Sequence, residues 1–351
     1  MTRRTTASVV ACVVLVALFV AAAFLPVPYV AMSPGPTIDV LGRRDGAPIV
    51  QVDGHERYPT KGELRLVTVS VTGPSHELSL AEALAAWFDP TRALYPRDVI
   101  YAPDTTVEQE RRESSVQMVS SQDTAIATAL RALGYELKPT TEVLAVSEGS
   151  PAEGKLEVRD RIVSVNGTKI TDASQVSEEI QKAGAGEPVQ IEVRRGGATK
   201  TVTVTPEPSA DDPDRAVIGV VIGRGYQFPF DVSVDISDNI GGPSAGLIFS
   251  LAIYDTLTPG PLVKGNDIAG TGTIAPDGSV GPIGGIQQKI VAAADDGATM
   301  FLVPPDNCDA ALQAPVDDEE IRLVKAPSMK SALESIRAYD ADHDAKLPSC
   351  A

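Results

Sequence analysis

One serine and one lysine in distinctive settings could together form a nucleophile and its base. Ser244 lies in the glycine-rich segment 241–246, GGPSAG, and Lys289 ends the segment 282–289, PIGGIQQK. A serine hydroxyl needs a proton acceptor before it can attack an electrophile. Histidine is the usual acceptor, but none of the three histidines lies in an apolar or glycine-rich setting: His55, His76 and His343. Lys289 is therefore the better candidate.

The residues around Ser244 predict a strand, a turn and a helix. Residues 231–236 alternate between polar and apolar, as in a half-buried strand, and lead into a polar, glycine-rich turn over 237–242. Pro243 suits the first position of a helix, and apolar side chains then recur at helical spacing: Leu247, Ile248, Leu251 and Ala252. We therefore expect Ser244 in the first helical turn, where free N–H groups could stabilise an alkoxide or an oxyanion.

Lys289 is expected on a helix that follows Gly284 and Gly285. Ile286, Lys289 and Ala293 would share one face of that helix, which places the amine beside apolar neighbours. Burial disfavours the charged ammonium and can lower the pKa of a lysine by several units. A neutral amine could then accept a hydroxyl proton near neutral pH.

Both motifs resemble those of the Lon-type serine proteases. That family has G-P-S-A-G around its nucleophile and P-I-G-G-x-x-x-K before its catalytic lysine, and the separation here (289 − 244 = 45) is similar to the family's. The resemblance implies catalysis by a dyad of Ser244 and Lys289. Gly242 and Ala245, which flank the serine in the motif, are expected to support it.

The resemblance carries further expectations. The segment 269–272, AGTG, falls where the family carries a threonine near the dyad, so Thr271 is expected to help orient Lys289. A homo-oligomeric ring is also expected by analogy. The chain departs from the family at Gly241, where ATP-dependent members usually have an acidic residue, and at Thr273, where a glutamate is usual. Control of the surrounding loops is therefore expected to differ.

A second resemblance, to the PDZ family, covers residues 117–207. Ser150-Pro151-Ala152 is followed by the segment 160–167, DRIVSVNG, close to the S-P-A and G-D-x-I-x-x-V-N-G of that family, with Arg159 in place of the usual glycine. PDZ domains bind the carboxyl terminus of a peptide as an added strand. The resemblance therefore implies recognition of protein or peptide substrates through their C-termini.

The peptide site of this module has two interpretations from the sequence. The tripeptide Leu133, Gly134 and Tyr135 resembles the loop that holds the peptide carboxylate, and Val176 and Ile180 are then expected near the side-chain pocket. The alternative is that the tripeptide is a helix C-cap with flanking apolar contacts. Both interpretations can hold together.

The amino-terminal segment predicts a membrane anchor. Residues 7–25 are 19 consecutive positions without a charge, and Arg3 and Arg4 precede them. Positive charge there is expected to keep residues 1–6 cytoplasmic, with the body outside the cytoplasm on a single-pass anchor at the cell membrane. A cleaved signal peptide is the alternative, since residues 21–23 are all alanine. In that compartment Cys308 and Cys350 could pair.

Composition excludes several classes of function. The net charge of −17 argues against nucleic-acid binding, since such modules display basic patches. No spacing of ligands suggests a metal, no cofactor is predicted, and the phosphate loop G-x-x-x-x-G-K-[ST] does not occur in the sequence, so activity without ATP is expected.

The predicted fold class is α+β: a Lon-type proteolytic domain with an inserted PDZ-like domain, preceded by one transmembrane helix. The predicted boundaries are 1–6 cytoplasmic, 7–25 anchor, 26–60 linker, 61–116 first protease segment, 117–207 PDZ-like domain, 208–216 linker, 217–340 proteolytic domain and 341–351 polar tail. The predicted function is membrane-anchored endopeptidase. The alternatives are a peptide-binding scaffold with an idle protease fold, and an α/β-hydrolase that uses Ser244 and His343.

Overall fold

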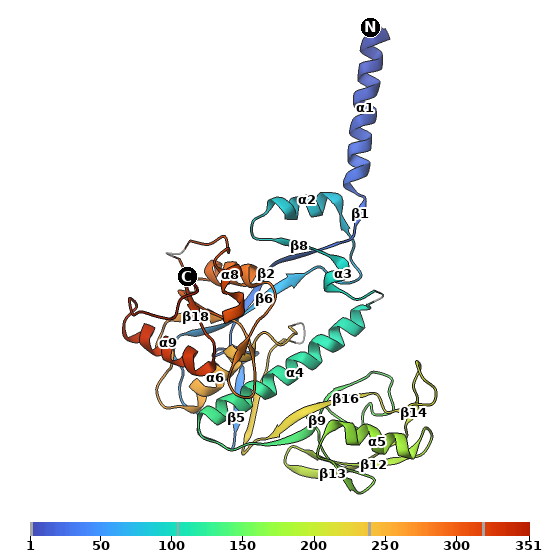
Figure 1. Ribbon diagram of the computed structural model, residues 1–351, viewed down its shortest axis with the longest axis vertical. Coiled ribbons are helices and arrows are strands. Elements are labelled where there is room, and N and C mark those ends of the chain that lie inside the picture. Colours follow the sequence, from blue (N-terminus) through green and yellow to red (C-terminus); the bar gives the residue numbers. More distant parts are fainter. Residues whose placement is uncertain (1–2, 104, 238–239, 318–319) are drawn as a thin grey trace.

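The computed structural model describes residues 3–103, 105–237, 240–317 and 320–351. Figure 1 shows a body of mixed sheet and helix, a smaller β-rich part, and the helix α4 (Val107–Ala132), which lies between them. The helix α1 (Arg3–Ala23) stands away from the body at the amino terminus (Figure 1). The architecture is therefore mixed α and β, as predicted.

Helix α1 occupies most of the segment in which the sequence predicts an anchor. Within the described part of the chain, no helix is both long enough and apolar enough to cross a bilayer. The predicted transmembrane helix over residues 7–25 is therefore not supported.

A six-stranded sheet forms the centre of the body. Its strand order is β22 (Arg322–Lys325), β21 (Met300–Val303), β18 (Asp267–Gly270), β6 (Glu63–Val71), β2 (Tyr29–Asp39) and β8 (Ala93–Pro96). The first four strands are parallel to one another, and β2 pairs antiparallel with both β6 and β8. Segments that precede the β-rich part in the sequence and segments that follow it thus share one sheet.

Helices cover both faces of this sheet because its strands alternate their apolar side chains. Met300 and Leu302 join the core under α6 (Gly246–Leu257) and α9 (Met329–Ala341). Phe301 and Val303 join the opposite core, under α7 (Ile286–Asp295) and α8 (Cys308–Ala311). Successive residues of a strand point to opposite faces, so a run such as Met300–Val303 is buried throughout.

Strand β2 lies in the segment for which the sequence predicts a linker, residues 26–60. Its prolines suggested a linker because a proline cannot donate to a strand ladder. The pairing of β2 with β6 shifts register between Pro34 and Thr37, and this irregularity accommodates Pro34 and Pro36 within the sheet. The extended conformation was predicted correctly, but its place in the central sheet was not.

The β-rich part is a sheet with its own apolar core. The strand order is β13 (Ala198–Val204), β12 (Val189–Arg195), β10 (Arg161–Val165), β9 (Lys138–Val146) and β16 (Val220–Gln227), and β11 (Thr168–Lys169) pairs with β10. Helix α5 (Ala173–Ala183) packs Val176 and Ile180 into the core. The sequence assigned residues 220–227 to the proteolytic segment, whereas β16 belongs to this sheet.

Helix α4 belongs to the core of the body. Thr106 caps it in a capping box with Gln109, and Ala125, Ile126 and Leu130 pack in the same cluster as α6. The predicted PDZ-like segment begins at residue 117, within this helix, which contacts strands β9 and β16 of the β-rich part as well as the core of the body.

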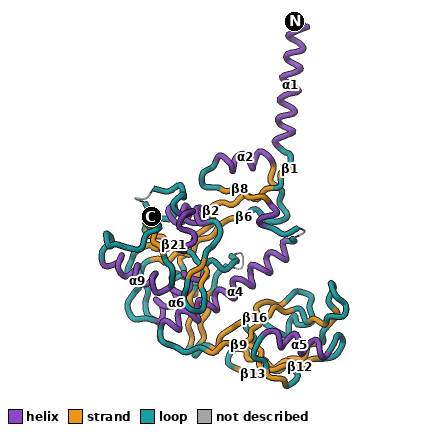
Figure 2. The backbone as a smooth tube through the Cα atoms, viewed as in Figure 1, coloured by secondary structure: helices purple, strands orange, loops and turns teal. Residues whose placement is uncertain are grey.

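The remaining elements are short. The strand pairs are β1 (Pro26–Val27) with β7 (Leu78–Ser79), β3 (Arg43–Arg44) with β4 (Ala47–Pro48), β5 (Val50–Asp53) with β17 (Asp231–Val234), β14 (Glu207–Pro208) with β15 (Ala216–Val217), and β19 (Thr273–Ile274) with β20 (Val280–Gly281). The other helices are α2 (Leu80–Phe88), α3 (Arg97–Ile100) and a 3₁₀ turn (Pro305–Asn307). Figure 2 shows how much of the chain between these elements is loop.

Candidate active site

Ser244 and Lys289 meet in the body although 45 residues separate them. The Lys289 ammonium donates to Ser244 Oγ across 2.8 Å. Lys289 is only 3% exposed, whereas Ser244 is half-buried and reachable. Burial lowers the pKa of Lys289 from 10.5 to about 8. An appreciable fraction of the amine is then neutral near physiological pH and can accept the serine proton.

Ser244 lies in the turn that precedes α6. The helix begins at Gly246 with Ala245 as its N-cap, so Ser244 is two residues before the first helical position and not within the first turn as predicted. Gly242 adopts φ +87°, a conformation that favours glycine. The chain thus turns sharply just before the serine and presents its hydroxyl beside the buried amine.

Thr271 connects the two residues of the dyad. Lys289 Nζ donates to Thr271 Oγ1 across 3.2 Å, and that hydroxyl donates to the backbone oxygen of Ser244 across 3.1 Å. The backbone N–H of Gly272 donates to the same oxygen across 2.8 Å. The loop after β18 therefore holds both the amine and the serine backbone, in the position predicted for Thr271.

Gly285 explains why two glycines precede the lysine helix. It is the N-cap of α7 with φ +67°, and a Cβ there would lie 2.7 Å from Val69 Cγ1 and 2.8 Å from Met32 Sδ. A Cβ on Gly284 would meet nothing within 4 Å. Only the second glycine is therefore required for α7 to approach strands β2 and β6, and this approach brings Lys289 to Ser244.

The dyad opens onto a cleft of about 650 Å³. Strand β6 lines it with residues 66–71, and apolar side chains from other elements add to the lining: Ile38, Met118 and Ile240. Such a cleft suits an extended chain with apolar side chains. The sequence analysis did not identify Met118, because nothing local in the sequence shows that α4 passes the active site.

A second cavity, of about 770 Å³, lies between α5 and the segment 216–222. Ile180 lines it, whereas Val176 is fully buried in the core behind. Gly219 has φ +74° and directly precedes the edge strand β16, which pairs only with β9 in its sheet among the residues described. A glycine turn before an open strand beside a helix is the arrangement into which a peptide can add as a strand.

Leu133, Gly134 and Tyr135 lie elsewhere and form a helix C-cap. The Tyr135 N–H donates to Leu130 O across 3.0 Å, and Gly134 has φ +90°. Leu133 and Tyr135 pack against the core of the body. The capping alternative therefore describes this tripeptide. The better candidate for the carboxylate loop is Val217-Ile218-Gly219, an apolar-apolar-glycine pattern before a strand that the sequence analysis overlooked.

His343 does not lie at the dyad. Its ring stacks on Tyr339 with centroids 4.4 Å apart, at the end of α9. The partner of Ser244 is Lys289, which removes the geometric basis for the α/β-hydrolase alternative.

Two family models match the chain. Residues 106–205 match the PDZ domain, and residues 237–335 match the Lon protease (S16) C-terminal proteolytic domain. The second match contains Ser244, Thr271 and Lys289.

Curated relatives carry the same assignment for part of the chain. Lon proteases of Methylocella silvestris, Frankia alni and Bacillus subtilis (Lon protease 2) are 46%, 38% and 37% identical over 22%, 30% and 28% of this chain. The matches span only 10%, 12% and 16% of those relatives' own lengths.

Among solved structures, the PDZ domain of the SdrC-like protein from Listeria innocua is 21% identical, covers 24% of this chain and 92% of its own, and has a TM-score of 0.22. The family matches together support a chain that combines a PDZ domain with a serine-type peptidase domain of Lon type.

Proposed function

We propose that this chain is a serine endopeptidase of Lon type that acts without ATP. The observation that carries the proposal is the 2.8 Å contact between Lys289 Nζ and Ser244 Oγ at a cleft, with the amine buried. Neutral Lys289 accepts the hydroxyl proton while Oγ attacks a peptide carbonyl carbon. The protonated amine then gives that proton to the leaving nitrogen, and an ester between Ser244 and the substrate remains.

The second half of the reaction uses the same two groups. Water attacks the ester carbon and gives a proton to neutral Lys289. The bond between that carbon and Ser244 Oγ then breaks, and Oγ takes the proton from Lys289 to become a hydroxyl again. Thr271 keeps the amine directed at Ser244 in both halves. Backbone N–H groups at the end of the turn, around Ala245, are the proposed donors to the oxyanion, since the Gly242 N–H donates to the backbone oxygen of Ser114.

Peptidase assays on an unfolded protein without nucleotide test this function. We expect Ser244→Ala and Lys289→Ala to lose activity, and Lys289→Arg to lose it as well, since a guanidinium stays protonated. His343→Ala serves as the control and should retain full activity. Cleavage by Ser244→Ala at the wild-type rate would refute the proposal, and an inactive wild type that still binds peptides would favour the scaffold alternative.

The cavity beside α5 is proposed to bind the carboxyl terminus of a protein or peptide. The open edge of β16 offers backbone partners for an added strand, and the turn at Gly219 offers N–H groups for a carboxylate. We expect a peptide with an apolar free carboxyl terminus to bind more tightly than its amide. Equal affinity of the two, measured by calorimetry, would exclude this mode of recognition.

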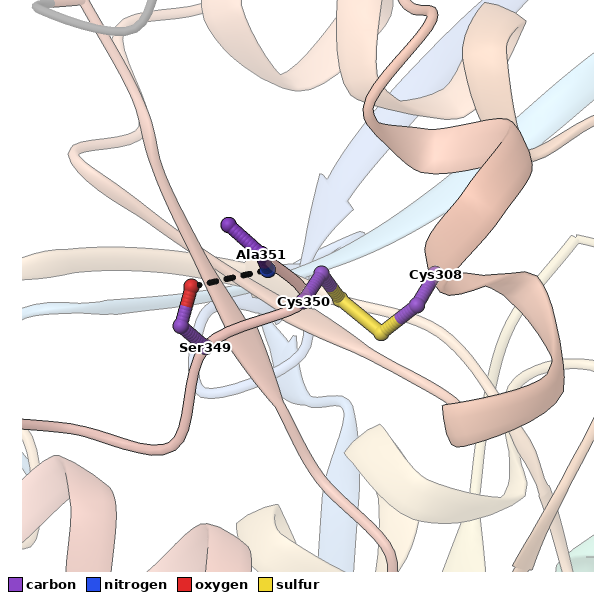
Figure 3. Close-up of a disulfide and its surroundings, with 4 residues drawn as sticks. All are labelled: Cys308, Ser349, Cys350 and Ala351. Carbon is purple, nitrogen blue, oxygen red and sulfur yellow. Dashed lines mark hydrogen bonds between the residues drawn. A yellow bond between two sulfur atoms is a disulfide. The ribbon is translucent and has the colours of Figure 1, made fainter.

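We also propose that the body works in an oxidising compartment outside the cytosol. Cys350, near the carboxyl terminus, forms a disulfide with Cys308 at the start of α8 (Figure 3). Disulfides persist mainly in oxidising compartments. Blocking free thiols in intact cells, followed by reduction and thiol labelling, should label Cys308 and Cys350 only after reduction; labelling before reduction would contradict this location.

A further inference from the structure

Helix α4 contacts the turn that holds the nucleophile. The backbone oxygen of Ser114 accepts from the Gly242 N–H across 3.1 Å, and Ser121 Oγ donates to the backbone oxygen of Pro243 across 3.1 Å. Between them on the helix, Met118 lines the catalytic cleft. Residues 114, 118 and 121 are spaced by four and three, so one face of α4 meets both the residues before Ser244 and the cleft.

The same helix contacts the PDZ-like domain through the next residues. Arg159 donates to Gln122 Oε1 across 2.7 Å, and its guanidinium lies 3.6 Å from the carboxylate of Asp123. Gln122 also donates to the backbone oxygen of Val234, on the strand that leads towards the nucleophile turn. The Arg159 side chain therefore contacts α4 at Gln122. The preceding residue of the helix, Ser121, is the one whose hydroxyl bonds to the nucleophile turn.

Arg159 occupies a position whose backbone favours glycine. Its φ is +71°, and the sequence resembles the PDZ family on both sides of it except that the family usually has glycine here. A bulky residue in the left-handed region costs conformational energy and marks a site where the side chain does something. The contacts of the Arg159 side chain with α4 offset the conformational cost of that backbone geometry.

Burial makes the contact specific. Asp123 is 2% exposed and Glu142, on β9, is 4% exposed, and both line a cavity of about 220 Å³ with Arg159. Burial is the main cause that raises the pKa of Glu142 to about 8, and the negative charge of the nearby Asp123 is the second. Burial also raises the pKa of Asp123. Around neutral pH the two carboxyls thus carry fewer than two charges. Three arginines line this cavity, Arg159, Arg161 and Arg194, and Arg159 is the one whose guanidinium lies 3.6 Å from the Asp123 carboxylate on α4.

We propose that Arg159 is a positioning residue for catalysis: by holding Gln122 and Asp123 of α4, it keeps that helix seated against the turn of Ser244. The PDZ-like domain thereby forms part of the structure that supports the nucleophile, in addition to binding peptides. This inference rests on the proposed peptidase function.

The variant Arg159→Gly tests the inference in the full chain. Glycine accepts φ +71° without strain, so the loop should keep its conformation while the contact is lost. We expect kcat on a short peptide to fall about tenfold or more, with KM little changed and the unfolding temperature within a few degrees of wild type. Arg159→Lys, which keeps the charge but not the planar fork, should restore part of kcat.

Asn166→Gly is the matched control. Asn166 also has positive φ, +49°, in the same domain, and its side chain accepts from the Gln190 N–H rather than contacting α4. It should leave kcat unchanged. If Arg159→Gly is unstable because Asp123 is left unbalanced, Arg159→Gly/Asp123→Asn removes both charges and takes its place in the test.

The outcomes separate the inference from the proposed function. A wild type no more active than Ser244→Ala would overturn both. An active wild type with unchanged kcat in Arg159→Gly, or in the double variant, would overturn the positioning role alone. A loss of kcat that only matches the loss of folded protein, with no recovery in Arg159→Lys, would also overturn the positioning role. It would show that Arg159 contributes to folding alone.

Discussion

We expect Lys289 to set the pH range in which Ser244 is activated. Burial lowers its pKa to about 8, so the neutral amine is the minor form below that pH and the major form above it. We expect kcat/KM to rise about tenfold per pH unit below about pH 8 and to level off above it. A profile measured from about pH 6 to about pH 10 checks this. A flat profile, or a rise only near 10.5, would show that the lysine is not the base or is not desolvated.

Thr271 tests how far the dyad depends on a third side chain. Thr271→Val keeps the shape but removes the oxygen that accepts from Lys289 and donates to Ser244. Loss of a hydrogen bond to a charged group costs about 1.5–3 kcal/mol, so kcat should fall roughly 10- to 100-fold. Thr273→Val, in the adjacent strand β19, is the control and should remain near wild type. Equal activity of the two variants would show that Thr271 contributes packing only and that its hydrogen bonds do not affect kcat.

At the scale of elements, the start of α7 determines where Lys289 lies. Gly285→Ala would place a Cβ against Val69 and Met32 at positive φ, with a backbone cost of about 1–2 kcal/mol and a similar cost for overpacking. We expect a lower unfolding temperature and loss of most peptidase activity as α7 shifts. Gly284→Ala meets no neighbour and should behave as wild type. Activity retained in Gly285→Ala would show that α7 tolerates displacement.

The elements around the dyad could be predicted from the sequence because their signals are local. A glycine-rich turn before an apolar helix, and two glycines before a second helix, were enough to select Ser244 and Lys289, whose side chains are in contact in the structure. Even there, α6 begins three residues later than expected, since Pro243 remains in the turn and Ala245 caps the helix. Helix boundaries depend on capping contacts that a pattern of residue types does not contain.

The elements that the sequence did not place are those whose partners are distant in the chain. Strand β2 looked like a linker because register shifts that accommodate proline appear only once strands are paired. Strand β16 looked like part of the proteolytic domain because it follows a proline-rich segment, but it pairs with β9 about 80 residues earlier. The same reason applies to the peptide site: the sequence analysis expected it at Leu133, Gly134 and Tyr135, whereas the turn at Gly219 that we propose comes after the rest of the domain.

At the scale of the whole molecule, two cavities on one chain suggest how a long substrate could be held. One lies at Ser244 and the other between α5 and the segment 216–222, and strand β16 beside the second pairs with β9, which carries Glu142 near α4. We expect a substrate bound at the second cavity to be tethered to the chain that carries the first. Tethering raises the effective concentration of the segment to be cleaved and needs no new contact at the dyad.

Tethering predicts that the KM of a substrate depends on its carboxyl terminus. A substrate that carries an apolar free carboxyl terminus, joined by a flexible linker to a cleavable segment, should have a KM about tenfold or more below that of the same substrate with an amidated end, at similar kcat. A short competing peptide with a free carboxyl terminus should raise the KM of the linked substrate but not that of a minimal one. If the competitor slows cleavage of the minimal substrate equally, it binds at the dyad and the two cavities do not cooperate. If the amidated substrate has the same KM as the free one, the PDZ-like domain contributes to catalysis only through its contact with α4.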